Sequence, residues 1–322
     1  MNSNDTILIT GATGFIGRHL TECLVKSHRI KVLVRKTSQT EDLENLGAEL
    51  VYGDLGDIES LKNAVNDVDI VYHLAEAKGS LKKAYNINVN ATKALINFSQ
   101  ALDVKRFVYV STVAVMGNVQ NIPVDETGPY DPYPLYFHAL SKTEGERYGF
   151  EKFEKGHLPF SVIRPAVVYS KASPFFLAIV DWMKKHKYIG TPILGQGNNT
   201  VHCAHIEDMV QALVLAATKY EAIGNAYIIV DDRPVSWNDF LEAIAHSLNI
   251  KLRVRHLPIA PIKLLSYFIE LITRLISNPV TIKPYIYFFT SNIHYNNSKA
   301  KRELGFRPKF PDPIEGVKHE II

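Results

Sequence analysis

Residues 10–17 carry three glycines at the spacing G-x-x-G-x-x-G, which suits a turn that binds phosphate. They follow an apolar run at 7–9, typical of a buried strand, and precede residues 15–25, whose apolar positions recur with helical spacing. A helix N-terminus offers unpaired N–H groups and a positive dipole, and glycines let a pyrophosphate approach the backbone. This pattern predicts a dinucleotide site formed by Gly11, Thr13, Gly14, Phe15, Ile16 and Gly17.

Two polar positions bear on which dinucleotide would bind. Arg35 ends a second apolar run, roughly 20 residues beyond the glycine turn, where the adenosine ribose binds in such folds. An acidic residue there would select NAD, whereas Arg35 followed by Lys36 offers positive charge to the 2′-phosphate of NADP. The alternative is a solvated basic pair on a loop. Asp54, after a third apolar run, would either accept a hydrogen bond from adenine or serve as an ordinary turn residue.

The composition predicts a soluble globular protein with a substantial core, since 46% of its 322 residues are hydrophobic. A formal charge of +3 gives no large basic surface, so we expect no nucleic-acid partner. The two cysteines, Cys23 and Cys203, are too few for a disulfide framework or a cysteine-based zinc site. A polar N-terminus without a signal peptide and a reducing compartment lead us to expect a cytoplasmic protein.

The order of segments predicts an α/β fold built on a doubly wound parallel sheet of the Rossmann type. Strand-like and helix-like segments alternate in the first half, and this alternation is lost in the second half. We expect a dinucleotide-binding domain over residues 1–165 and a smaller, interleaved C-terminal α/β substrate lobe over 166–322. Segments around 203–232 are expected to return to the first domain.

Several motifs occur in an order that resembles the extended short-chain dehydrogenase/reductase superfamily. This group contains nucleotide-sugar epimerases, dehydratases, dihydroflavonol reductases and 3β-hydroxysteroid dehydrogenases. The matching segments span almost the whole chain and lie at residues 10–17, 53–55, 73–75, 88–92, 110–117, 141–144, 164–169 and 297–306.

The resemblance implies roles for individual residues. Thr112 matches the hydroxyl that binds the substrate oxygen, with Ser111 beside it, and Lys142 matches the lysine that holds the nicotinamide ribose. Asn88 matches the asparagine that supports a proton-relay water. Further cofactor contacts fall on Leu55, Leu74, Ala75, Asn90, Pro165, Val167 and Val168. The family also implies a homodimer formed through the helices expected near 84–102 and 139–155.

His138 is the main departure from the family pattern, which has a tyrosine as general acid/base four residues before the lysine. Residues i and i+4 share one helical face, so His138 and Lys142 are expected to point the same way. Three interpretations stay open. His138 is the acid/base of a retuned enzyme, or another residue or a water transfers the proton, or redox chemistry has been lost. Tyr136 would help only if the chain there is still a loop, because i and i+2 do not share a face.

Three other features bear on the substrate. Residues 195–202 lack the arginine that often binds the diphosphate of a nucleotide sugar in this family. His202 and His205 form a histidine pair that no carboxylate or cysteine completes, so we expect no metal. Phe175 and Phe176 would line an apolar pocket or anchor a helix in the core.

The most hydrophobic segment covers residues 261–276. It is too short and too charged to span a bilayer, which needs ~20 apolar residues. It is expected either to pack over the substrate lobe, or to form a lid over a lipophilic substrate or a weak membrane contact. Its apolar stripe consists of Ile262, Leu265, Ile269, Ile272 and Leu275.

Together these patterns predict an NADP(H)-dependent oxidoreductase, with NAD as the other possible cofactor. It would transfer hydride to or from a small carbonyl or alcohol substrate, and a lipophilic substrate is favoured. The alternatives are a nucleotide-sugar epimerase or dehydratase, and a non-catalytic NAD(P)-binding protein.

Overall fold

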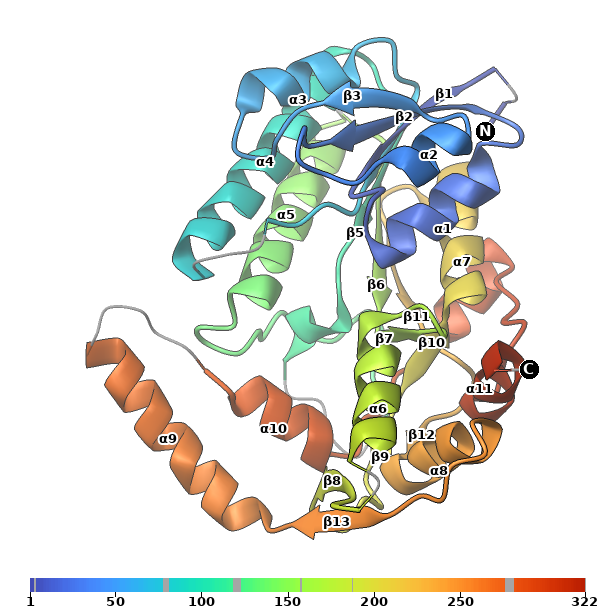
Figure 1. The fold of residues 1–322 in the computed structure, drawn as a ribbon. Helices are drawn as coiled ribbons and strands as arrows, with labels where there is room; N and C mark the ends of the chain where they lie inside the picture. The colour runs from blue at the N-terminus through green and yellow to red at the C-terminus, as the bar shows by residue number, and fades with distance from the viewer. Residues whose placement is uncertain are drawn as a thin grey trace.

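A seven-stranded sheet forms the centre of the molecule, and every strand pair in it is parallel (Figure 1). The computed structural model describes residues 1–2, 4–77, 81–117, 123–156, 158–186, 188–275 and 281–321. The strand order is β11-β6-β5-β4-β1-β2-β3. The strands are β1 Thr6–Thr10, β2 Arg29–Val34, β3 Glu49–Tyr52, β4 Ile70–His73, β5 Arg106–Val110, β6 Phe160–Pro165 and β11 Ala226–Ile229.

Helices cover both faces of this sheet because its central strands are apolar on both sides. In β1, Ile7 and Ile9 pack toward α1, α2 and α7, whereas Leu8 packs toward α3, α4 and α5. The first layer contains α1 Phe15–Leu24, α2 Glu41–Asn45 and α7 Ile206–Thr218; the second contains α3 Ile58–Val65, α4 Leu81–Ala101 and α5 Phe137–Glu154. The doubly wound α/β fold expected from the sequence is confirmed.

The second half of the chain builds a smaller group of elements beside the carboxyl ends of the central strands (Figure 1). Three two-stranded sheets pair β10 with β7, β12 with β9 and β13 with β8. The strands are β7 Val167–Tyr169, β8 Thr191–Leu194, β9 Thr200–Val201, β10 Cys203–His205, β12 Val235–Ser236 and β13 Val254–Leu257. The helices are α6 Pro174–Lys185, α8 Trp237–Ser247, α9 Ile259–Leu275, α10 Lys283–Thr290 and α11 Pro313–Ile321.

Residues 206–229 return to the central sheet, where they supply α7 and the edge strand β11 beside β6. Short helical turns at Val113–Met116, Tyr220–Ala222 and Ala300–Leu304 complete the described elements. The proposed domain division at residue 165 stays a prediction. In the described part of the chain, no helix is long and apolar enough to cross a membrane.

His73, at the end of β4, joins three elements of the central core. Its Nδ1 lies 2.7 Å from the Thr10 hydroxyl of β1, and its Nε2 lies 2.9 Å from the Thr92 hydroxyl of α4. Burial, assisted by the positive charge of Lys142, lowers the pKa of His73 to about 3. The ring therefore stays neutral at physiological pH and holds the ends of β1 and β4 in a fixed relation.

This buried imidazole predicts a pH dependence of stability. Below pH 6.5 the unfolded chain protonates His73 while the folded chain does not, so the free energy of unfolding falls with decreasing pH. The slope from this group reaches about 1.4 kcal/mol per pH unit between pH 6.5 and pH 3. We expect His73→Gln to flatten the slope by that amount in urea unfolding followed by circular dichroism. Equal slopes for the two proteins would contradict this assignment.

Candidate active site

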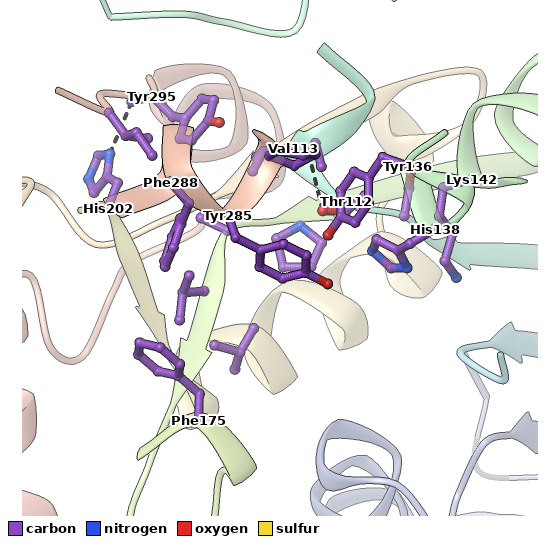
Figure 2. A pocket seen from close by; sticks show the side chains of 18 of the residues that line it. Thr112, Val113, Tyr136, His138, Lys142, Phe175, His202, Tyr285, Phe288 and Tyr295 are labelled. Carbon is purple, nitrogen blue, oxygen red and sulfur yellow. Dashed lines mark hydrogen bonds between the residues drawn. The ribbon is translucent and has the colours of Figure 1, made fainter. Parts of the chain in front are cut away.

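A cavity of about 580 Å³ opens at the carboxyl ends of β1, β4, β5 and β6. Strand order reverses between β1 and β4, because β2 and β3 extend the sheet on one side and β5 and β6 on the other. Ligands of open α/β sheets bind at such a reversal. Figure 2 shows Thr112, His138 and Lys142 toward one side of the cavity, and Phe175 and Phe288 toward the other.

Many, but not all, of the site residues predicted from the sequence line this cavity. Those in its wall are Phe15, Ile16, Leu74, Thr112, His138, Lys142, Pro165, Val167 and Val168. Gly11, Thr13 and Gly14 lie in the turn that leads into Phe15, and Gly17 lies in the first turn of α1. Five others lie outside the wall: Arg35, Asp54, Leu55, Ala75 and Asn90.

The glycine turn packs against the chain that follows β4. Gly11 has φ +79°, and a Cβ added there would lie 2.8 Å from the amide nitrogen of Ala75. A Cβ on Gly17 would lie 2.2 Å from the Gly11 carbonyl oxygen. Gly14 is the N-cap of α1, and no side chain caps the helix. The tight turn and the uncapped helix start fit the pyrophosphate of a dinucleotide.

The end of β2 carries an exposed cation. Arg35 directly follows β2, and among the described residues it forms no ion pair. Arg18 in α1, by contrast, forms an ion pair with Asp42 at 2.7 Å. The Asp54 carboxylate accepts a hydrogen bond from the Gly56 amide at 2.8 Å, so it does serve as a turn residue. This contact leaves the proposed adenine contact of Asp54 untested.

Asn90 and Asn88 occupy different positions on α4. Asn90 is exposed and lies outside the cavity wall, so the structure does not bring it to the other site residues. The side-chain Oδ1 of Asn88 accepts a hydrogen bond from the Ala77 backbone amide at 2.6 Å. Asn88 therefore braces the chain just after β4, beside Glu76.

Helix α5 presents His138, Lys142 and Glu146 at intervals of four residues, which places them on one face. Glu146 forms a buried ion pair with Arg164 of β6 at 2.6 Å, and this contact fixes the rotation of the helix against the sheet. Removing one partner of such a pair typically costs about 3–5 kcal/mol. The ion pair thus holds Lys142 and His138, which lie one and two helical turns before Glu146, at the cavity.

Lys142 is buried and tied to the sheet. Its ammonium group donates a hydrogen bond to the Val110 carbonyl oxygen at 2.8 Å and lies 4.9 Å from the centre of the Tyr109 ring. Burial lowers the pKa of Lys142, although the charges of Glu76 and Glu146 oppose this shift. The lysine stands in the cavity wall at the end of β5, where the resemblance places the nicotinamide ribose.

His138 has a carboxylate partner that sequence reasoning missed. Its Nδ1 lies 2.7 Å from Oε1 of Glu76, and both side chains line the cavity. An ionised Glu76 accepts a hydrogen bond, so Nδ1 carries the proton of the neutral ring and Nε2 is left to act as a base. Glu76 lies 62 residues before His138 in the loop after β4, directly after the motif at 73–75. In the sequence, only its position directly after that motif pointed to a role for Glu76 in the site.

Tyr136 also reaches the cavity. It is the N-cap of α5 and not a helical residue, so the loop geometry that its participation requires is present. Its ring lies 5.6 Å from that of His138 and 6.0 Å from that of Tyr285. Burial is the main cause that raises the pKa of Tyr136 to about 12. Its phenol therefore stays protonated and can donate a hydrogen bond, but it cannot act as a base near neutral pH.

The far wall of the cavity is aromatic and comes largely from α10. Sequence reasoning did not single out this helix, which contributes Pro284, Tyr285, Tyr287, Phe288 and Phe289. The two phenylalanines at 175 and 176 occupy different environments. Phe175 lines the cavity at 6.3 Å from the Phe288 ring, while Phe176 is buried in the core.

The histidines at 202 and 205 have separate protein partners. His202 lies in the cavity wall, where its Nδ1 accepts from the Tyr295 amide and its Nε2 donates to the Asp231 carbonyl oxygen, each at 3.0 Å. His205 is paired with Glu320 at 2.8 Å. In the described part of the chain, no group of three or more His, Cys, Asp or Glu residues is placed to hold a metal ion.

Comparison with known protein families identifies the family of this chain. The model of the NAD-dependent epimerase/dehydratase family matches residues 7–230, more than half of the chain. The chain belongs to this family. Its predicted membership in the extended short-chain dehydrogenase/reductase superfamily is thereby confirmed.

The chain is also similar to two curated proteins and to one solved structure. A 4-hydroxy-2-methyl-3-oxo-4-farnesyl-3,4-dihydroquinoline-1-oxide ketoreductase from Stigmatella aurantiaca is 24% identical, covering 92% of this chain and 90% of the relative. A 3beta-hydroxysteroid-dehydrogenase/decarboxylase from Arabidopsis thaliana is 25% identical, with coverages of 98% and 78%. A UDP-glucuronic acid 4-epimerase from Bacillus cereus, solved with UDP-glucuronic acid and NAD, superposes with a TM-score of 0.75 at 22% identity, covering 98% of both chains.

The glycine turn provides a test of dinucleotide binding. A Cβ on Gly14 would meet only the Gly11 carbonyl oxygen, at 3.1 Å, so a larger side chain extends outward over the start of α1. We expect Gly14→Val to weaken NADPH and NADH binding by more than about tenfold in titration calorimetry, because it blocks the approach of phosphate. Thermal unfolding should change little. Unaltered affinity for both nucleotides would remove the glycine turn from the cofactor site.

Proposed function

We propose that this chain is an NADP(H)-dependent oxidoreductase that interconverts a lipophilic ketone or aldehyde and the matching alcohol. One observation carries the proposal: a carboxylate-paired histidine and the Thr112 hydroxyl line the same cavity, opposite an aromatic wall. A proton-transfer group, a hydrogen-bond donor for the substrate oxygen and an apolar surface for the substrate therefore face one volume.

The cofactor assignment rests on the residues that fit a dinucleotide. The uncapped start of α1 would take the pyrophosphate, and Lys142 would lie against the nicotinamide ribose. Exposed Arg35, without an ion-pair partner among the described residues, favours the additional phosphate of NADP. The Bacillus cereus epimerase was solved with NAD, which makes NAD the alternative cofactor.

The residues of the chain would divide the chemistry as follows. When bound, the reduced nicotinamide supplies hydride to the carbonyl carbon. The Thr112 hydroxyl donates a hydrogen bond to the substrate oxygen and stabilises the negative charge that develops there. Nε2 of protonated His138 then gives its proton to that oxygen, and the alcohol forms. Glu76 keeps hold of Nδ1, so the imidazole retains its orientation and returns to its neutral form.

A lipophilic substrate is supported by the wall of the cavity and by the relatives. Among the described residues that line the cavity, Lys142 is the one Lys or Arg side chain, and it already donates to Val110. A nucleotide sugar would place a diphosphate in the same volume, so an epimerase or dehydratase is the weaker candidate. The names of the Stigmatella and Arabidopsis relatives specify a farnesyl-bearing quinoline oxide and a 3β-hydroxysteroid. Both compounds are largely apolar.

His138→Gln tests the proton-transfer role. Glutamine can still hydrogen-bond to Glu76, but it cannot transfer a proton, so we expect kcat to fall by about 10²–10⁴. NADPH affinity should stay within about threefold, because the cofactor phosphates bind elsewhere. The assay follows NADPH consumption with a panel of apolar ketones. Full turnover by the variant would assign proton transfer to another group, with Tyr136→Phe as the matched comparison.

Glu76 tests the positioning part of the same proposal. Glu76→Gln replaces the acceptor with an amide that can donate to Nδ1 and so select the wrong tautomer. We expect kcat to fall by at least tenfold while KM changes little, and Glu76→Asp to restore part of the activity. A rise in KM with unchanged kcat would indicate a substrate contact and contradict the positioning role.

Arg35→Ser tests the choice between the two nucleotides. Removing the cation should weaken NADPH binding by about tenfold and leave NADH binding nearly unchanged, because only NADPH carries the 2′-phosphate. Lys219→Ser, an exposed substitution after α7, is the matched control. Stronger binding of NADH than of NADPH by the native chain would exclude the NADP assignment.

The homodimer expected through α4 and α5 stays a prediction.

A further inference from the structure

Helix α9 turns polar residues toward the protein and apolar residues toward the surface, the opposite of what is expected for a helix that faces water. Ser266 and Glu270 are 1% and 7% exposed and face the body of the protein. The opposite side carries large apolar residues that are each between 54% and 77% exposed: Leu264, Leu265, Tyr267, Phe268, Leu271, Ile272 and Leu275. An amphipathic helix in water buries its apolar side instead. The expectation that the stripe of residues 261–276 packs over the substrate lobe is therefore wrong for Leu265, Ile272 and Leu275.

Polar contacts with the start of α10 fix this orientation. Glu270 accepts hydrogen bonds from the Thr281 hydroxyl and from the Lys283 ammonium group, the latter at 2.8 Å. The Lys283 ammonium group also lies 4.3 Å from the centre of the Tyr267 ring. Because Ser266 and Glu270 are held inward, the apolar side of α9 faces outward. Figure 1 shows α9 at the outer edge of the molecule, next to α10 and following β13.

Positive charge is concentrated around this apolar surface. Residues 251–283 contain six of the 36 Lys and Arg residues and one of the 33 Asp and Glu residues, a formal charge of +5. The whole chain has a charge of +3, so the remainder is net negative. Lys251, Arg253, Arg255 and Lys263 are exposed, whereas the one acidic residue, Glu270, is buried. An apolar helix face flanked by exposed cations matches the boundary between headgroups and acyl chains in an anionic bilayer.

We propose that the outward face of α9 is a membrane-docking surface that inserts into one leaflet of an anionic phospholipid bilayer. The helix would lie in the plane of the interface, since it is not long and apolar enough to span the membrane. Charge argues against a second copy as the occupant. A twofold interface through α9 would place two segments of charge +5 against each other, and like charges across an interface are unfavourable.

Docking through α9 would also place the cavity close to the bilayer. Helix α10 lies between α9 and the cavity, since Lys283 contacts Glu270 while Tyr285 lines the cavity wall. Tyr285 is 54% exposed, so the aromatic wall reaches the surface beside the docking face. A lipophilic substrate dissolved in the leaflet would then reach the cavity without crossing water. This last step, unlike the docking itself, rests on the proposed function.

Vesicle flotation of the full chain tests the docking surface. The probes are phosphatidylcholine vesicles and vesicles of phosphatidylcholine mixed with phosphatidylglycerol. The variant Leu264→Ser/Phe268→Ser/Leu271→Ser removes apolar area from the exposed side of α9, so its folding should be unaffected. The matched control, Leu102→Ser/Leu177→Ser, alters Leu102 just beyond α4 and Leu177 on α6, which are 44% and 50% exposed.

We expect native protein and control to float with the mixed vesicles and the α9 variant to bind them at least about tenfold more weakly. Arg253→Gln/Arg255→Gln should weaken binding to mixed vesicles only, and added salt should weaken it further. Absence of native binding to either vesicle, or equal binding of variant and control, would overturn the proposal. A solution dimer that the α9 variant dissociates would assign the face to a second copy and also overturn it. Vesicle binding needs no turnover, so docking without activity would leave this inference standing while the proposed function fails.

Discussion

The reversal of strand order between β1 and β4 is the constraint on which the site depends. At this point the loops that follow the two strands diverge, and a crevice opens at their carboxyl ends. His73 holds the ends of the two strands together through the Thr10 hydroxyl, and the glycine turn packs on the chain beyond β4. The glycine turn and the Glu76 loop are therefore positioned by one junction, and His138 at the start of α5 contacts that junction through Glu76.

A carboxylate–histidine pair lies at the position where the family resemblance leads one to expect a tyrosine. A tyrosine serves as acid/base when a neighbouring cation favours its phenolate. Here the Lys142 ammonium group is held by the Val110 carbonyl, and the charged group that faces position 138 is the carboxylate of Glu76. A carboxylate suits a histidine, because it accepts from Nδ1 and stabilises the cation formed during proton transfer. The Glu76 carboxylate and the His138 imidazole thus form a pair suited to proton transfer.

The sequence predicted the sheet and the cofactor turn because both are local patterns. Each central strand is a short apolar run, and Gly11, Gly14 and Gly17 follow the first of them directly. Glu76 could not be assigned, because its contact with His138 spans 62 residues and depends on the fold. For α9, helical spacing identified the apolar stripe but not which side the protein would cover. The aromatic wall from α10 was missed because its residues lack a recognisable motif.

Proton transfer by His138, paired with Glu76, is the step on which the proposed activity depends. Its most direct test is single-turnover oxidation of enzyme-bound NADPH by an apolar ketone, compared between the native chain and His138→Tyr. We expect rapid oxidation by the native chain and slow oxidation by the variant, because the Glu76 carboxylate disfavours a phenolate at that position. A native chain that binds NADPH but oxidises none, together with turnover that appears only in the tyrosine variant, would contradict it.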